Sequence, residues 1–192
     1  MLAGCIRFAK RFLTYEVWRI YSFDTSRAHA PEGQIRVTRI EDTEAVHVGA
    51  PKELLRARCD REGAIGFAAW ADGELAGVCW LWPGSMLTER PIGAQPPDCA
   101  EIIQITVAER ARGRGIAPHL IGTAARCMRE LGFRRLYAQI WHSNTASMKA
   151  FRKCAWEAVA WVVAVEPRWL PHLRIRRKLQ RWQRSTDLLP NW

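Results

Sequence analysis

The sequence predicts an α/β fold built on one mixed sheet, and three observations indicate it. The segment Glu101–Val107 is rich in β-branched residues, as expected of a buried strand, and a glycine turn and a helical pattern follow it. Two apolar runs separated by Asp72-Gly73 have the composition of a hairpin with a two-residue turn. Strand and helix periodicities then alternate between residues 34 and 166, so this range is expected to form one domain.

The elements before the hairpin are expected as follows. Apolar residues at helical spacing predict a short basic amphipathic helix in the first dozen residues. Tyr15–Phe23 is aromatic and β-branched, and we expect it to add a strand to an edge of the sheet. A loop over His29–Gln34 leads to the first strand of the domain proper, Gln34–Ile40, in which apolar and polar residues alternate.

Two helices and the hairpin come next. Asp42 or Thr43 is expected to cap a short helix ending near Gly49, and Pro51 to start a second one that reaches about Arg61. The hairpin strands are expected over Ile65–Trp70 and Leu75–Trp82. Residues 83–98 contain four prolines and two glycines, and such a long loop is a candidate for lining a binding pocket.

The strand Glu101–Val107 leads into the most informative turn of the chain. Gly113 and Gly115 stand two apart among three arginines, and the helix that follows has Pro118 just inside its start and Gly132 at its end. Glycine lets a backbone approach an anion closely, and the N–H groups of a first helical turn point toward it. The segment therefore predicts a phosphate-binding turn.

The last elements are predicted with the same criteria. A strand is expected over Arg134–Trp141, a helix capped by Asn144 to about Cys154, and a final strand over Glu157–Val165. Beyond Pro171, apolar residues at helical spacing among arginines predict a basic amphipathic helix near the C-terminal end.

Composition limits the class of protein. The net charge is +10, but residues 1–19 carry +3 and residues 168–192 carry +6, which leaves +1 for the middle. A nearly neutral domain with basic ends is not typical of a nucleic-acid-binding fold. The six cysteines form no Cys-x-x-Cys pair, so we expect reduced thiols, no metal site and a cytoplasmic location.

Two motifs resemble those of a known family. Arg112-x-x-Gly115-x-Ala117 is neither the dinucleotide fingerprint nor the Walker loop, and it resembles the acetyl-CoA signature of the GNAT superfamily, the acetyl-CoA-dependent N-acetyltransferases. The segment from Asn144 through Phe151 to Trp156 resembles the second conserved segment of that family. The order of predicted elements from residue 34 to 166 also agrees with the family, so fold, motifs and order point the same way.

The resemblance implies a more detailed fold and a cofactor. We expect a mixed, mostly antiparallel central sheet with splayed middle strands and helices on both faces, with residues 34–166 as the domain and 1–33 and 167–192 as extensions. Acetyl-CoA is the implied co-substrate, and its pantetheine arm would lie between Glu101–Val107 and Arg134–Trp141. The implied cofactor-binding residues are Ile105, Thr106, Val107, Arg112, Gly113, Arg114, Gly115, Ile116, Ala117, Asn144 and Phe151.

The resemblance also gives these residues roles. The backbone N–H of Val107 would stabilise the oxyanion, Gly113–Ala117 would hold the pyrophosphate, and Asn144 and Phe151 would line the thiol end. Many family members have a tyrosine where this chain has Phe151, and that phenol protonates the departing thiolate. Phenylalanine cannot donate a proton, so no general acid is assigned.

Glu101 is the expected general base. It stands six residues before Val107, the distance at which the histone-acetylating branch of the family carries its catalytic glutamate, and strand alternation places it on the same face as Ile103, Ile105 and Val107. The competing interpretation is a glutamate at a strand end that faces solvent. Asp98 and Gln104 are lesser candidates. His142 follows a central strand and could approach the site, although a histidine at a strand end is more often plain surface, and His119 is expected to belong to the helix after the glycine turn rather than to act as a base.

The leading functional hypothesis is an N-acetyltransferase that acts on a small-molecule or peptide amine by direct attack. A non-enzymatic acyl-CoA-binding or tethering module is the alternative from another class, and an acyltransferase with a longer acyl or carrier-protein donor is the nearer one. The basic ends would hold the protein peripherally at the inner membrane surface or bind an acidic partner. The more common role of such an apolar stripe is to dock on its own domain or on the second subunit of a homodimer.

Overall fold

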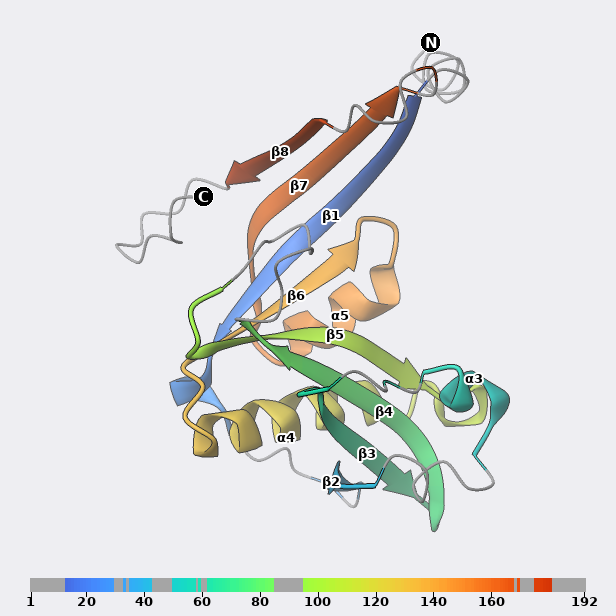
Figure 1. Cartoon of the computed structure of the whole chain (residues 1–192). Coiled ribbons are helices and arrows are strands. Elements are labelled where there is room, and N and C mark those ends of the chain that lie inside the picture. Colours follow the sequence, from blue (N-terminus) through green and yellow to red (C-terminus); the bar gives the residue numbers. More distant parts are fainter. Residues whose placement is uncertain are drawn as a thin grey trace.

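The computed structural model describes residues 13–29, 33, 35–42, 50–57, 59, 62–84, 95–167, 169 and 175–180. Within these residues eight strands form one sheet in the order β2-β3-β4-β5-β6-β1-β7-β8 (Figure 1). All neighbouring strands are antiparallel except β5 and β6, which are parallel. The mixed, mostly antiparallel sheet expected from the sequence is confirmed.

The first half of the sheet contains the predicted hairpin. Its strands are β2 (Arg36–Ile40), β3 (Ile65–Ala71), β4 (Glu74–Pro83) and β5 (Cys99–Val107). Asp72 and Gly73 join β3 to β4 with φ angles of 54° and 79°. Two consecutive left-handed residues are what a type I′ hairpin turn requires, and aspartate–glycine provides them at little cost.

The helices before the hairpin differ from the prediction. The helix predicted to begin at Pro51 is a single turn, α3 (Lys52–Leu55), with Pro51 as its N-cap, so the expected end near Arg61 is wrong. Leu54 on this turn is fully buried and anchors it to the core. The helix expected after Asp42 lies mostly outside the described residues, as does most of the loop over residues 83–98.

The second half of the sheet contains β6 (Arg135–Trp141), β1 (Leu13–Asp24) and β7 (Glu157–Pro167). β1 pairs with β6 on one side and with β7 on the other, so the expectation of an edge strand at Tyr15–Phe23 is wrong. Ile20 and Tyr21 point to opposite faces, and both are fully buried, which is typical of a central strand. The helix predicted for the first dozen residues lies outside the described part of the chain.

The C-terminal part of the sheet corrects another expectation. Residues Ile175–Gln180 form β8, which pairs antiparallel with β7, where a basic amphipathic helix was predicted. Ile175 and Leu179 are four residues apart, which places them on one face of a strand as well as on one face of a helix. The open edge of β7 decides between the two because it offers backbone partners along its length. The rest of the predicted helix lies outside the described residues.

Two longer helices pack on one face of the sheet. α4 (Ile116–Glu130) links β5 to the parallel strand β6, and α5 (Thr145–Lys153) links β6 to β7 (Figure 1). A Cβ atom on Gly77 of β4 would lie 3.0 Å from Ile116 Cγ2 and 3.2 Å from Leu120 Cδ1, so a larger residue would crowd α4 where it approaches the sheet. Gly132, with φ of 90°, ends α4 as predicted.

The middle strands separate after four residue pairs. Cys99–Ile102 of β5 pairs with Arg135–Ala138 of β6, and the remainder of each strand diverges from the other (Figure 1). The register of β5 against β4 shifts at the same point, because Leu81 faces Ile102 whereas Trp80 faces Gln104. Ile103 is therefore the extra residue of a β-bulge, which bends β5 away from β6. The splayed middle strands expected from the sequence are confirmed.

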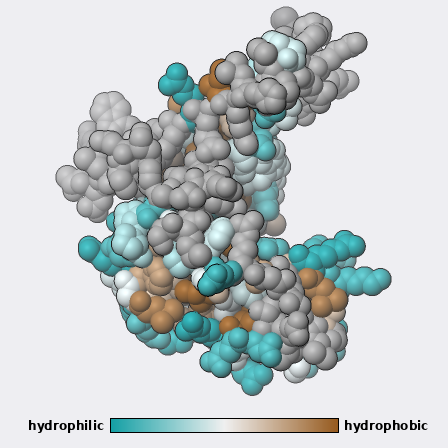
Figure 2. All heavy atoms as spheres, in the orientation of Figure 1, coloured by the Kyte–Doolittle hydropathy of each residue, from teal (hydrophilic) through white to brown (hydrophobic). Residues whose placement is uncertain are grey.

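Hydrophilic residues surround the hydrophobic ones on the face shown in Figure 2, so the described surface is mixed there. Among the described residues, no helix is both long and apolar enough to cross a membrane.

Removal of β8 is expected to destabilise the fold. Truncation after residue 174 exposes the edge of β7, and we expect a thermal midpoint several degrees lower than after truncation at Gln180, since about 1 kcal/mol corresponds to roughly 2–4 °C in a chain of this size. The pair of truncations isolates the six residues of β8. Equal midpoints in differential scanning calorimetry would show that β8 does not stabilise the sheet.

Candidate functional site

Two grooves meet where β5 and β6 separate. The first, here called the turn groove, has a volume of about 550 Å³ and lies between the end of β5, the glycine turn and α5. The second, here called the gap groove, has a volume of about 500 Å³ and lies between the diverging parts of β5 and β6. Four residues line both grooves: Ile105, Thr106, Ser147 and Phe151. The two grooves therefore adjoin, and together they are called the channel below.

The glycine turn sits at the outer end of this channel. Gly113 and Gly115 adopt φ angles of 80° and 82°, which glycine reaches without strain. Gly115 is the N-cap of α4, and its carbonyl accepts a hydrogen bond from the backbone N–H of His119 at 3.2 Å. The N–H groups of Ile116 and Ala117 precede the first intrahelical bond, and both residues line the turn groove. The first turn of a helix is a position where an anion can be stabilised.

The arginines of the turn have different roles. Arg112 lines the turn groove and lies 3.5 Å from Glu109. Arg114 instead forms a 2.7 Å ion pair with Asp72 on the β3–β4 hairpin. The hydrogen bond from Arg114 lowers the pKa of the Asp72 carboxyl, and that carboxylate raises the pKa of the guanidinium. Arg114 therefore holds the turn against the hairpin.

Two lysines that the sequence analysis did not identify add positive charge to the turn groove. Lys149 and Lys153 lie on α5 and line the turn groove opposite Arg112. They are four residues apart, so both project from one face of the helix. That spacing was the signal in the sequence, but nothing there indicated that this face of α5 turns toward the glycine turn.

Most of the predicted cofactor-binding residues come together. The structure places nine of them in the lining of the turn groove: Ile105, Thr106, Val107, Arg112, Gly113, Gly115, Ile116, Ala117 and Phe151. Arg114 is directed to Asp72, as described above. Asn144 lines the gap groove, and its Oδ1 accepts a hydrogen bond from the Ser147 N–H at 3.1 Å, which caps α5 as predicted.

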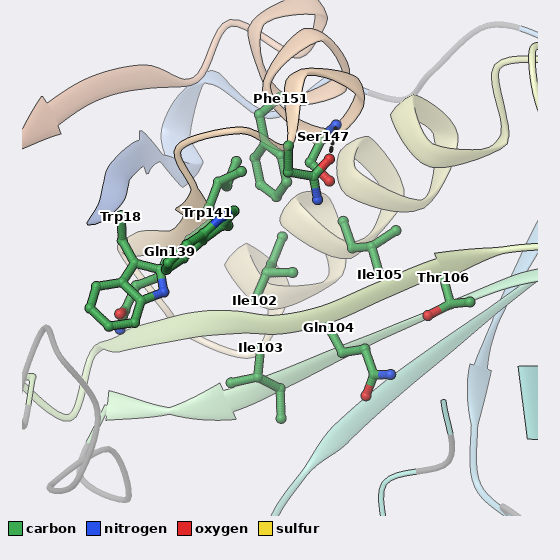
Figure 3. A pocket seen from close by; sticks show the side chains of 13 residues that line it. Trp18, Ile102, Ile103, Gln104, Ile105, Thr106, Gln139, Trp141, Ser147 and Phe151 are labelled. Atoms are coloured by element: carbon green, nitrogen blue, oxygen red, sulfur yellow. Dashed lines mark hydrogen bonds between the residues drawn. The ribbon is translucent and has the colours of Figure 1, made fainter. Parts of the chain in front are cut away.

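The bulge determines which side chains face which half of the channel. Figure 3 shows Ile102 and Ile105 pointing toward Phe151 on α5, whereas Ile103 and Gln104 point to the other side of the strand. Glu101 pairs with Trp82, which lies on the same face of β4 as Trp80, the partner of Gln104. Glu101 is therefore on the face opposite Ile105 and Val107. The expectation that it shares their face is wrong because the extra residue reverses the alternation.

Glu101 is buried at the inner end of the gap. Its side chain is 0% exposed, so the interpretation of a solvent-facing glutamate is wrong. The Nε2 of Gln139, from β6, donates a hydrogen bond to its Oε2 at 3.1 Å and thereby bridges the two strands where they begin to separate. Gln139 also lines the gap groove, so the carboxylate lies directly behind the groove wall.

The lesser candidates lie elsewhere, apart from Gln104, which lines the gap groove. The Asp98 carboxylate accepts a hydrogen bond from the Cys99 thiol at 3.6 Å and lies 3.8 Å from Arg134, at the start of the paired strands. The His142 ring packs against Trp141 at 5.2 Å, and His119 bonds to Gly115 within α4. Neither histidine is among the described residues that line the two grooves.

Phe151 forms the wall that the two grooves share. Its ring is 4% exposed, packs edge-on against Trp156 at 4.8 Å, and lies tilted against Tyr21 at 6.1 Å. The residue that faces the channel at this point is thus an aromatic hydrocarbon without a proton to donate. In the described part of the chain, no group of three or more histidine, cysteine, aspartate or glutamate side chains could hold a metal ion.

The splayed sheet with a glycine turn and a helix N-terminus at its mouth defines an acyltransferase domain. The chain belongs to the acetyltransferase (GNAT) family, whose family model matches residues 16–156. No protein with curated annotation matches the chain in sequence.

Solved structures show the same fold at low sequence identity. A GCN5-related N-acetyltransferase from Kribbella flavida is 12% identical with a TM-score of 0.57, over 84% of this chain and 62% of that protein. An acetyltransferase of the GNAT family from Novosphingobium aromaticivorans is 17% identical with a TM-score of 0.55, over 80% of this chain and 65% of that protein. The aminoglycoside N-acetyltransferase AAC(6')-Iy, solved with CoA, is 21% identical with a TM-score of 0.50, over 64% of this chain and 91% of that protein. The chain thus spans somewhat less than two thirds of the first two proteins.

Replacement of Gly115 tests the turn. We expect Gly115→Glu to abolish CoA binding in isothermal titration calorimetry, because it adds a carboxylate at the anion site and a side chain at a φ of 82°. Gly132→Glu is the matched control, since Gly132 has a similar φ of 90° but lies at the opposite end of α4. Unchanged affinity in folded Gly115→Glu protein would exclude a cofactor role for the turn.

The two lysines of α5 allow a milder test. We expect Lys149→Ala and Lys153→Ala each to weaken CoA binding by up to about fivefold, because an exposed ion pair contributes roughly 0–1 kcal/mol. The loss should shrink in high salt, as screening predicts. Lys52→Ala, on α3 and away from the turn groove, is the control. Loss of affinity that does not depend on salt would contradict a phosphate contact.

Proposed function

We propose that the protein is an N-acetyltransferase that transfers the acetyl group of acetyl-CoA to a primary amine by direct attack. One observation carries the proposal: two adjoining grooves run from the glycine turn to the gap between β5 and β6, where the lining residue Gln139 bonds the buried Glu101. One end of this channel suits an anion, and the other end offers a carboxylate for proton transfer.

The binding of acetyl-CoA follows from the walls of the turn groove. The pyrophosphate would lie over Gly113–Ala117, with Arg112, Lys149 and Lys153 around it. The pantetheine arm would lie along Ile103–Val107, the part of β5 that no longer pairs with β6, and its amides would take the place of the missing strand. The thioester would then lie beside Phe151, with Asn144 at the same end.

The chemistry needs few protein groups. Glu101 removes the proton of the amine, directly or through a water molecule, and the nitrogen attacks the thioester carbonyl. The backbone N–H of Val107 stabilises the oxyanion in the tetrahedral intermediate. When the intermediate collapses, the C–N bond remains, the C–S bond breaks, and the CoA thiolate leaves with the electron pair. Phe151 offers no proton, so the thiolate is protonated by water.

The general base is tested by an isosteric substitution. We expect Glu101→Gln to lower kcat by roughly 10²–10⁴-fold, the usual contribution of a general base, with little change in CoA affinity. The acidic limb of the pH–rate profile should disappear in the same variant. Glu130→Gln, on the exposed surface of α4 where it pairs with Arg126, is the control. Wild-type activity of Glu101→Gln at neutral pH would show that the base lies elsewhere.

A further inference from the structure

We infer that the acceptor is a primary amine attached to an aromatic body, and that Trp18 and Trp141 hold this body while Gln139 positions the nitrogen. The inference names the substrate class of the proposed acetyltransferase and rests on that function. It follows from three features of the gap groove: a pair of tryptophans, a lining without charge, and one buried amide oxygen without a partner.

The tryptophans form a fixed pair at one end of the gap groove. Trp18 of β1 and Trp141 of β6 are direct cross-strand neighbours, and their rings meet edge to face with centroids 5.7 Å apart (Figure 3). Both line the groove, and Trp141 is 37% exposed, so an aromatic surface remains open to a ligand. Aromatic rings pack on such a pair with about 0.5–1.5 kcal/mol beyond the burial of area.

This pair lies on the face of the sheet where Glu101 lies. Trp141 and Gln139 are two residues apart on β6, so their side chains project to the same face, and Glu101 bonds to Gln139 from the neighbouring strand. α4 and α5 cover the opposite face, where Phe151 packs on Tyr21. An acceptor on the tryptophans would therefore approach the thioester from the side opposite the CoA phosphates.

The lining of the gap groove disfavours polycations. None of the described residues that line it carries a charge. A polyamine or an aminoglycoside would bring several ammonium groups, and each would lose hydration without a lining carboxylate to replace it. Most of the described lining is apolar: Trp18, Ile102, Ile103, Ile105, Ala138, Ile140, Trp141 and Phe151. Such a surface suits an apolar body with a single amine.

Gln139 supplies the one polar contact that such an amine needs. An ionised carboxylate only accepts hydrogen bonds, so the amide nitrogen of Gln139 must face Glu101, and its oxygen is directed elsewhere. This Oε1 atom is buried and has no hydrogen-bond partner among the described residues. A buried acceptor without a donor is costly, and the N–H of an acceptor amine would satisfy it. Gln139 is therefore a positioning residue that places the nitrogen beside the base.

The test compares acceptors in a thiol-release assay with acetyl-CoA. The panel consists of 2-phenylethylamine and tryptamine, with butylamine, spermidine and kanamycin as non-aromatic amines. We expect kcat/KM to be at least about tenfold higher for the two aromatic amines. Preference for spermidine or kanamycin would overturn the acceptor class and leave the acetyltransferase itself intact. Absence of both CoA binding and turnover would instead refute the proposed function.

Variants assign the preference to the tryptophans. We expect Trp18→Leu and Trp141→Leu to raise KM for the aromatic amines about threefold to tenfold more than KM for butylamine, since an aromatic contact contributes about 0.5–1.5 kcal/mol. Trp161→Leu, on β7 and outside the groove lining, is the matched control. An equal effect of all three substitutions would contradict a specific aromatic site.

The variant Gln139→Leu distinguishes a positioning role of Gln139 from a role in packing alone. We expect it to raise KM for every amine and to move the acidic limb of the pH–rate profile to higher pH, because a carboxylate that loses an N–H donor binds its proton more tightly. A variant that only disturbed packing would leave that limb in place. If CoA binds but no amine reacts, calorimetry of 2-phenylethylamine with the CoA complex decides, and the absence of binding overturns the inference.

Discussion

The separation of β5 from β6 beyond Ile102 is the constraint on which the rest of the structure depends. The two halves of the sheet are antiparallel and continuous, and only four parallel residue pairs join them. The bulge at Ile103 prevents further pairing because it turns β5 away while keeping its bonds to β4. The facing edges are left with backbone groups that need partners, and a ligand with amides along its length can supply them.

α4 connects this gap to the glycine turn. Parallel neighbours require a crossover, so the chain must leave the end of β5, pass under the sheet and return to the start of β6. The N-terminus of the crossover helix thus falls at the carboxyl end of β5, where α/β sheets commonly bind ligands. Gly77 allows this helix to lie close to β4, and Gly115 gives its first turn the left-handed entry. The crossover through α4 therefore determines the position both of the gap and of the glycine turn beside it.

The sequence predicted the elements whose signals are local. Aspartate–glycine specified the hairpin, and Gly113, Gly115 and Gly132 marked the two ends of α4, since each needs a positive φ. Signals that depend on pairing were ambiguous: Ile175 and Leu179 fit a strand as well as a helix, and nothing local showed that β1 has neighbours on both sides. The bulge also left no signature, so the face of Glu101 could be decided only from the register of β5 on β4.

The two sides of the channel differ in a way that accounts for Phe151. Basic residues and helix N–H groups gather on the α4 side, whereas two tryptophans and a buried carboxylate lie on the other. In the proposed function, the thioester is the part of the donor that reaches the acceptor between these two sides. Phe151 stands between them with its ring packed on Trp156 and Tyr21. A hydroxyl there would need a hydrogen-bond partner within an aromatic cluster, at the cost of a buried polar group. The ring keeps the wall apolar, which in the proposed function leaves protonation of the thiolate to water.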